Sequence, residues 1–267
     1  MRSVSLLDLA MKGLPLRDTL IIDCHWHLGY WGAETYWFTP DRQCDVNIEV
    51  MDNIGIDMVC ANNVNIPPPK CNDLTIECVQ KYPDRIVGFA SVNPFYPDEV
   101  RDELERCFKV PGVKGIKVVS LNVFYLAPLP LYRIGRPESA LYQEVWDFAA
   151  EKRCPILCHG IVTEEIVRDN PDTIFIPAHS APGWEWPLRL SKYDNVYFDT
   201  ASTGTLSGSI EYLIKRIGAD RILYGSDFPA SDPAFRLGTI LSLKIKEEDK
   251  EKIMGLNMKK LLENVKS

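Results

Sequence analysis

Short apolar runs alternate with segments of helical periodicity along the chain. Eight runs, most of them four to eight residues long and rich in Val and Ile, are candidate strands. They cover residues 20–23, 58–64, 86–92, 115–120, 155–160, 173–180, 196–202 and 221–227. Continuous apolar runs of this length are typical of strands that are buried on both faces, as in a parallel sheet.

Segments with a helical pattern lie between the runs. The main ones cover residues 45–54, 71–82, 98–108, 139–152, 163–169 and 208–217, and a final amphipathic helix is predicted over 247–265. Asp98 and Ser139 are candidate N-caps, and Pro83 and Gly218 are candidate stop signals. Eight strands alternating with helices over ~250 residues are the pattern of a (β/α)8 TIM barrel. The rival is a doubly wound open sheet, which usually has fewer strands and a glycine-rich turn after the first, absent here.

Length and composition change this picture little. The 267 residues are 46% hydrophobic and 25% charged, which excludes disorder, collagen or a coiled coil as a description of the whole chain. We expect a single domain over residues 1–267, since single α/β barrels often reach this length. A net charge of −7 argues against nucleic acid or an anionic membrane as the main partner. We predict no transmembrane helix and no signal peptide.

The cysteines bear on the compartment. The chain has eight, with no CxxC pair and no dense disulfide spacing. In a chain of this size they predict free thiols in a reducing, cytoplasmic environment. Cys24 and Cys158 each precede a histidine, but strand alternation should point both away from it and into the core.

All four histidines lie at the carboxyl ends of predicted strands. His25 and His27 follow the first strand, His159 ends the fifth and His179 ends the sixth. Residues two apart on a strand share a face, so His25 and His27 can point into the barrel together. Asp227 ends the last predicted strand. Because barrel enzymes work at the carboxyl ends of their strands, these residues predict a metal site for Zn²⁺, Fe²⁺, Co²⁺ or Mn²⁺.

Two other side-chain patterns have simpler interpretations. Asp23 and Asp199 also lie at strand ends, where we expect them to support the site or the fold instead of binding metal. Ser180 and Ser226 could suggest a serine hydrolase, but the chain has no GxSxG elbow to support that chemistry.

The segments that carry these residues resemble a known superfamily. IIDCHWHLG, GIKVVS, PILCHG, FIPAHSAPG, VYFDTAS and RILYGSDFP resemble the amidohydrolase superfamily, over about residues 19 to 265. More narrowly they resemble its amidohydrolase-2 group, which includes aminocarboxymuconate semialdehyde decarboxylase-like enzymes and TIM-barrel metal-dependent hydrolases. The resemblance implies a distorted (β/α)8 barrel with one divalent metal, usually Zn²⁺. It matches the ligand positions to His25, His27, His159 and Asp227, and His179 to a histidine that acts on water or substrate.

Lys117 lies in the fourth predicted strand, and its role needs a separate interpretation. In binuclear members of the superfamily a carbamylated lysine at the end of this strand bridges two metals, whereas the amidohydrolase-2 group often has a lysine here without that role. We favour a buried Lys117 that pairs with a carboxylate or a substrate anion. Many relatives also have a histidine and a proline just after this lysine, where this chain reads KVVSLN, so that part of the pocket differs.

Two stretches are candidate substrate-binding loops. Residues 121–139 carry Arg133 and Arg136 among aromatic residues, and the stretch after the first strand carries Trp31. Two arginines suit a planar carboxylated substrate, because guanidinium binds carboxylate through two hydrogen bonds. The alternatives are a solvated surface excursion for the first stretch and packing over the barrel mouth for the second.

Together these features predict a metal-dependent hydrolase of a small, carboxylated lactone, amide or ester. Metal-activated water would attack, Asp227 would shuttle the proton, and His179 would orient the water or polarise the carbonyl. The runner-up is a non-oxidative decarboxylase with the same ligands, and a third alternative is a barrel that binds metal or ligand without catalysis. The expected partner is a small molecule, and a homodimer is a further possibility.

Overall fold

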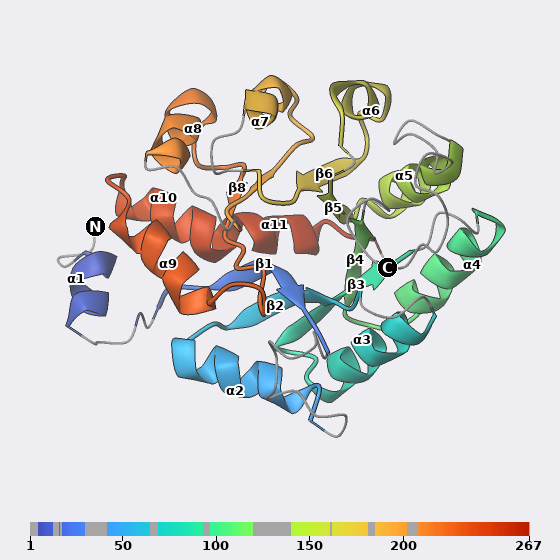
Figure 1. Ribbon diagram of the computed structural model, residues 1–267, viewed down its shortest axis with the longest axis horizontal. Coiled ribbons are helices and arrows are strands. Elements are labelled where there is room, and N and C mark those ends of the chain that lie inside the picture. Colours follow the sequence, from blue (N-terminus) through green and yellow to red (C-terminus); the bar gives the residue numbers. More distant parts are fainter. Residues whose placement is uncertain are drawn as a thin grey trace.

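The computed structural model describes residues 5–12, 16, 18–29, 42–64, 69–92, 97–119, 140–160, 162–180, 185–201 and 208–266. In these ranges eight strands form the centre of the molecule, and helices lie outside them (Figure 1). The strands are β1 (Ile22–His27), β2 (Met58–Asn62), β3 (Ile86–Ser91), β4 (Val113–Val119), β5 (Pro155–His159), β6 (Ile174–Pro177), β7 (Phe198–Asp199) and β8 (Ile222–Leu223).

The strands follow one another around a barrel in the order of the sequence. β1 to β6 form one parallel sheet, and β7 pairs in parallel with β8. Phe175 in β6 pairs with Val196 just before β7, and Trp26 in β1 pairs with Phe228 after β8. These bridges join the two sheets, so the predicted barrel is confirmed in a distorted form. The open-sheet alternative is wrong, because a doubly wound sheet reverses its strand order at one point.

Each strand is followed by a helix on the outside of the barrel. These helices are α2 (Asp45–Ile54), α3 (Lys70–Lys81), α4 (Pro97–Phe108), α5 (Ala140–Lys152), α6 (Glu164–Asp169), α7 (Glu185–Leu190), α8 (Ser209–Ile217) and α9 (Pro233–Ser242). The chain begins its described part with α1 (Leu6–Met11) and ends it with α10 (Glu247–Glu251), the π-helical turn η3 (Lys252–Leu256) and α11 (Asn257–Glu263). Among the described helices, none is both long and apolar enough to cross a membrane.

Apolar side chains from the inner faces of the strands fill the barrel towards the amino ends of the strands. This cluster includes Ile22, Val87 and Leu157, together with Met258 and Leu261 from α11. The helix α11 therefore packs against the amino ends of the strands and closes that end of the barrel. The carboxyl ends, where the polar residues gather, form the opposite mouth.

The predicted elements agree with the observed ones in order and approximate position, but the last three strands are shorter than predicted, and β7 and β8 have two residues each. The first strand was predicted over 20–23 but runs to His27, so the paired histidines lie within β1. The sequence analysis also missed α1, α7 and α9. For α9 the signals were present, because Pro233 occupies the first helical turn and Asp232 caps it, accepting from the Ala234 N–H at 2.8 Å. The predicted stops at Pro83 and Gly218 are correct. The predicted N-cap Asp98 is wrong, because α4 begins at Pro97 and Asp98 lies inside it, while Ser139 lies outside the described residues.

The prediction of eight free thiols is wrong for two of them. Cys44 and Cys78 form a disulfide, with Cα atoms 5.1 Å apart, while the other six cysteines are free and buried. Cys44 directly precedes α2 and Cys78 lies in α3, so the bond joins two helices of the outer layer. The pair escapes sequence analysis because 34 residues separate its members and only the barrel brings them together.

Candidate metal centre

His25 and His27 point into the barrel mouth from β1. The pairing of β1 with β2 shifts register between Asp23 and Trp26, and this bulge brings both imidazoles inward. Their Nε2 atoms lie 3.2 Å apart, and both side chains are buried. Trp26, which lies between them, points outward, and its Nε1–H donates to Asn47 Oδ1 in α2 at 2.7 Å.

Asp227, four residues after β8, brings a carboxylate to the two histidines. Its Oδ1 lies 3.2 Å from the Nε2 of His25 and 3.2 Å from the Nε2 of His27. Its own N–H donates to the backbone oxygen of His25 at 2.9 Å, which fixes the turn next to β1. Asp227 has a φ of 66°, and such left-handed conformations in residues other than glycine are often found at functional sites.

The contacts of the Nδ1 atoms decide which nitrogen of each ring offers its lone pair to a cation. His25 Nδ1 lies 2.7 Å from Asp199 Oδ2, and His27 Nδ1 lies 2.9 Å from Asn62 Oδ1. The Asn62 amide nitrogen donates to the Trp26 oxygen at 3.2 Å, so its oxygen must face His27. Both Nδ1 atoms therefore carry the hydrogen, and both Nε2 atoms offer a lone pair.

Three acceptor atoms thus converge on one point: the two Nε2 atoms of His25 and His27, and Oδ1 of Asp227. Two imidazoles and a carboxylate are a ligand set that binds Zn²⁺, Mn²⁺ and similar divalent ions. The donor set therefore fits a divalent metal ion, which would contact all three atoms at once.

The protonation states also fit a metal. Burial lowers the pKa of His25 and His27, and it lowers the pKa of His159 to about 3, so all three rings are neutral at pH 7. Burial opposes the charged form of Asp227, but at acidic pH its interactions with the protonated forms of His25 and His27 outweigh this effect and hold its pKa well below the ordinary value. Neutral imidazole and ionised carboxylate are the forms that bind metal.

Lys117 lies beside the same point, as a buried side chain of β4. Its Nζ is 3.2 Å from His25 Nε2, and burial lowers its pKa to about 8. At pH 7 most of this side chain remains cationic, so it adds a positive charge at the mouth of the barrel. The prediction that Lys117 is buried is correct.

His159 and His179 lie next to the converging acceptors. The ring centre of His179 is 5.1 Å from that of His25 and 4.8 Å from that of His159. His179 Nε2 is 4.0 Å from Asp227 Oδ2, the oxygen that is not shared by the His25–His27 pair. Within the described residues, ligand atoms gather within 4.8 Å of one another in two groups, His25 with His27 and Asp227, and His25 with His179 and Asp199. His159, predicted as a ligand, belongs to neither group.

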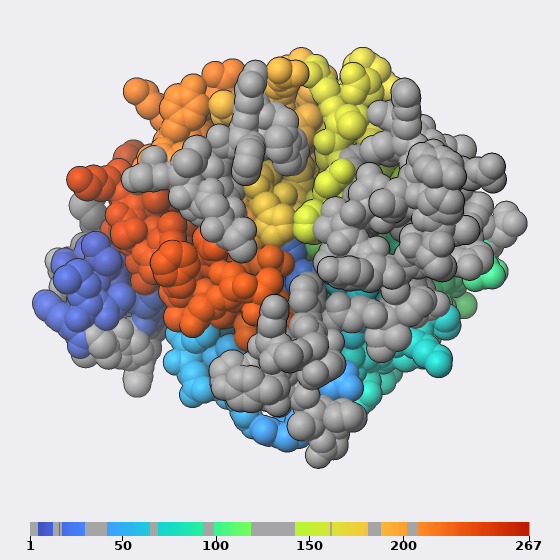
Figure 2. Space-filling model, viewed as in Figure 1, coloured from blue at the N-terminus to red at the C-terminus, as the bar shows by residue number. Residues whose placement is uncertain are grey.

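Segments distant in the sequence thus meet at one place. Figure 2 shows blue, yellow and orange-red parts of the chain in contact near the middle of one face. Sequence analysis found the histidines and Asp227 but missed Asn62, although it ends β2 at the same level as the ends of its neighbours. The predicted substrate-binding residues Trp31, Arg133 and Arg136 lie outside the described residues.

Gly225 leaves room for the buried carboxylate of Asp199. A Cβ at position 225 would lie 2.2 Å from Asp199 Oδ1 and 3.1 Å from His25 Cβ. We expect Gly225→Ala to destabilise the protein by roughly 1–3 kcal/mol and to weaken metal binding, because both groups must move. Urea unfolding and metal titration would check this. Gly238→Ala is the matched control, since a Cβ there meets nothing within 4 Å, and equal effects of the two changes would contradict the prediction.

The buried carboxyl of Asp23 gives a pH-dependent prediction. Its Oδ1 accepts from the N–H groups of His25 and Ser226, both at 3.0 Å, and burial raises its pKa from 3.8 to about 7. The folded protein therefore holds this proton more tightly than the unfolded chain, and the resulting stability is lost as the pH rises through 7. Relative to Asp23→Asn, the unfolding free energy of the metal-free protein should fall by up to about 4 kcal/mol between pH 4 and pH 8. If urea unfolding shows that the difference in unfolding free energy between the wild-type protein and Asp23→Asn does not change with pH, the prediction is contradicted.

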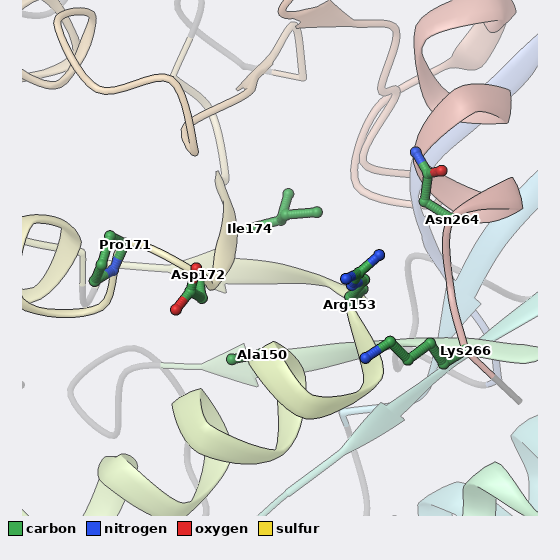
Figure 3. Close-up of a pocket in the computed structure, with 7 residues that line it drawn as sticks. All are labelled: Ala150, Arg153, Pro171, Asp172, Ile174, Asn264 and Lys266. Carbon is green, nitrogen blue, oxygen red and sulfur yellow. The ribbon is translucent and has the colours of Figure 1, made fainter.

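A separate hollow lies at the other end of the barrel (Figure 3). It has a volume of about 730 Å³ and includes Arg153, just before β5, and Ile174, the first residue of β6. Asn264 and Lys266 from the end of the chain complete one side. Because these residues mark the amino ends of strands, the hollow is distinct from the histidine site at the carboxyl ends.

Comparison with known proteins identifies relatives of nearly the whole chain. The sequence profile of the family named Amidohydrolase matches residues 22–263. Gamma-resorcylate decarboxylase from Rhizobium sp. (strain MTP-10005) is 24% identical over an alignment of 245 residues. The match covers 72% of this chain and 74% of that protein. Among solved structures, 2,6-dihydroxybenzoate decarboxylase from Rhizobium has a TM-score of 0.72 at 18% identity, covering 92% of this chain and 99% of its own. 5-Carboxyvanillate decarboxylase from Novosphingobium aromaticivorans, complexed with manganese and 4-hydroxy-3-methoxy-5-nitrobenzoic acid, has a TM-score of 0.71 at 16% identity, covering 93% and 97%.

Proposed function

Because the chain belongs to the amidohydrolase family, we propose that it is a metal-dependent, non-oxidative decarboxylase of a small carboxylated phenol. The observation that carries the proposal is the convergence of His25 Nε2, His27 Nε2 and Asp227 Oδ1 at the mouth of a parallel barrel. The similarity to gamma-resorcylate decarboxylase favours decarboxylation over the hydrolysis that the sequence analysis placed first.

One divalent ion would be held by His25, His27 and Asp227, with His159 as a proposed fourth ligand. The sequence analysis favoured Zn²⁺, and manganese in the relatives' structures makes Mn²⁺ a second candidate. When bound, the ion supplies a Lewis acid for the oxygens of an anionic substrate. Lys117 adds a buried cation beside it, and we propose that its ammonium contacts the substrate carboxylate or phenolate. Arg133, Arg136 and Trp31 remain predicted substrate contacts.

The two oxygens of Asp227 face different partners, which suits a dual role. Oδ1 faces His25 and His27, whereas Oδ2 faces His179 Nε2 at 4.0 Å. We propose that Asp227 binds the metal through Oδ1, and that Oδ2 and His179 hold the proton that the reaction consumes. His179 is 25% exposed, more than the buried ligands, so it can exchange that proton with solvent.

The reaction balances with groups of this chain alone as proton carriers. The bond between the ring carbon and the carboxylate carbon breaks, CO₂ leaves, and the electron pair remains on the ring carbon. A proton from the Asp227–His179 pair is then transferred to that carbon, and solvent restores the proton to the pair. Hydrolysis would instead require attack by water on a carbonyl carbon and would release no CO₂.

The proposal is tested by a direct product assay. Protein loaded with Mn²⁺ or Zn²⁺ is incubated with 2,6-dihydroxybenzoate and related hydroxybenzoates, and in parallel with carboxylated lactones and esters. We expect one CO₂ and one phenol per acid consumed, and loss of turnover after removal of the metal with a chelator. Metal-dependent opening of lactones or esters, with no CO₂ from any hydroxybenzoate, would replace decarboxylation by hydrolysis.

A further inference from the structure

We infer that Asp199 is a positioning residue whose single carboxylate sets the direction of both rings that flank Asp227, those of His25 and His179. The inference rests on the proposed function, because it assigns Asp199 a role in preparing a metal ligand and a proton carrier. From its position at a strand end alone, Asp199 is expected only to support the site or the fold.

The carboxylate of Asp199 is fully buried and accepts from three donors. Oδ2 accepts from His25 Nδ1–H at 2.7 Å and from the backbone N–H of His179 at 3.3 Å. Oδ1 accepts from the backbone N–H of Ala201 at 2.6 Å. All three of these contacts come from N–H groups, so the Asp199 side chain acts here as an acceptor on both of its oxygens.

The contact with His25 fixes the tautomer of a proposed ligand. With a carboxylate at Nδ1, the hydrogen of the neutral ring stays on Nδ1, and the lone pair of Nε2 points to Asp227 Oδ1 at 3.2 Å. A carboxylate behind a metal-binding imidazole also raises the basicity of the ligand nitrogen. His27 has the neutral amide of Asn62 in the same position, so the two histidines are not equivalent.

The contacts with His179 hold a strained backbone and orient its ring. His179 has a φ of 58°, in the left-handed region, and Asp199 Oδ2 accepts its N–H. The ring is held from the other side, because His179 Nδ1 lies 3.0 Å from the oxygen of Ala201, whose N–H Asp199 also accepts. As with His25, the hydrogen lies on Nδ1 and Nε2 faces Asp227. One side chain therefore directs two rings towards one carboxylate.

The residues around Asp199 hold its backbone and leave room for its carboxylate. Its own N–H donates to Ser180 Oγ at 3.0 Å, which ties β7 to the residue after His179. Gly225 has no side chain where a Cβ would meet Asp199 Oδ1 at 2.2 Å. A substitute must fit this space and also accept from donors on both oxygens. Asparagine fits but has a single oxygen, so its NH₂ group would face either Ala201 N–H or the His25–His179 pair of donors.

The test uses the small number of histidines. The chain has four, so protein labelled with ¹⁵N in histidine gives few ring signals, and long-range ¹H–¹⁵N spectra report the tautomer of each. In the metal-free and Zn²⁺-bound wild-type protein we expect His25 and His179 to carry hydrogen on Nδ1. In Asp199→Asn we expect His25 to lose its single tautomer and the Zn²⁺ dissociation constant to rise by about 10- to 100-fold.

Matched variants separate this role from a structural one. Asp23→Asn alters another fully buried carboxyl near His25, but it contacts the His25 backbone and not the ring. It should therefore leave the histidine tautomers unchanged. His25→Ala reports on the proposed function itself, because it should abolish Zn²⁺ binding whatever Asp199 does.

Each outcome decides one claim. A wild-type His25 with hydrogen on Nε2 overturns the inference without any variant, even if Asp199→Asn fails to fold. A folded Asp199→Asn with wild-type tautomers and Zn²⁺ affinity also overturns it. Two Zn²⁺ per wild-type chain and one in Asp199→Asn would make Asp199 a ligand of a second ion, which contradicts positioning. Unchanged Zn²⁺ binding in His25→Ala would contradict the proposed function instead.

Discussion

Asp227→Asn is expected to lose both the metal and the activity. Asparagine nearly preserves the shape, but a neutral amide is a poorer ligand than the carboxylate whose Oδ1 faces His25 and His27 at 3.2 Å. It also cannot hold the proton that Oδ2 would share with His179. We expect metal content to fall well below one per chain, and kcat/KM to fall by roughly 10²–10⁴-fold even with excess metal.

Elemental analysis and steady-state kinetics check this prediction. Asp232→Asn is the control, because this carboxylate caps α9 and accepts from the Ala234 N–H, away from the ligand set. It should leave the metal content unchanged. An Asp227→Asn protein with a full complement of metal and normal turnover would show that the carboxylate neither binds the ion nor carries the proton.

His179→Asn is expected to separate the two functions that Asp227 combines. Its ring lies near the ligand set, yet its Nε2 faces Asp227 Oδ2 at 4.0 Å and not the shared Oδ1. We therefore expect nearly full metal occupancy but a loss of ~10²-fold or more in kcat, the range for a missing acid–base group. Metal titration beside kinetics gives both numbers for the same preparation.

The opposite pattern would change the assignment of ligands. If His179→Asn lost as much metal as His25→Ala, His179 would belong to the coordination sphere. The second group of converging atoms, from His25, His179 and Asp199, would then be the metal site. His159→Asn in the same experiment tests the fourth proposed ligand, which the structure places beside His179.

Much of this site could be predicted because short stretches of the sequence contain the signals for it. Apolar runs gave the eight strands, and the position of each histidine at the end of a run gave the mouth of the barrel. The HxH spacing was enough to place His25 and His27 on one face. Asp227 followed from the same logic at the eighth strand.

Other features depend on contacts that no local pattern contains. The bulge between Asp23 and Trp26 arises from pairing with β2 and decides how far both histidines turn inward. Asn62 and Asp199 orient ring nitrogens across 35 and 174 residues of sequence, so only the closed barrel shows which ring each of them contacts. The disulfide between Cys44 and Cys78 likewise depends on the fold, which brings together residues 34 positions apart in the sequence.

The choice between decarboxylation and hydrolysis could not be made from the residues, because both reactions need the same ligands and a proton carrier. The proposal of decarboxylation rests on the similarity to gamma-resorcylate decarboxylase, whose name gives a carboxylated phenol as its substrate. The remaining distinction is chemical: only decarboxylation creates a new carbon–hydrogen bond.

Turnover of 2,6-dihydroxybenzoate in D₂O by the metal-loaded protein tests this claim most directly. The proposal predicts resorcinol with one deuterium on the carbon that carried the carboxylate, released with one CO₂ and not formed by the Asp227→Asn protein. If the metal-loaded protein forms no deuterated phenol from this acid or its hydroxybenzoate analogues, yet opens lactones or esters in the same buffer, the decarboxylase account is wrong.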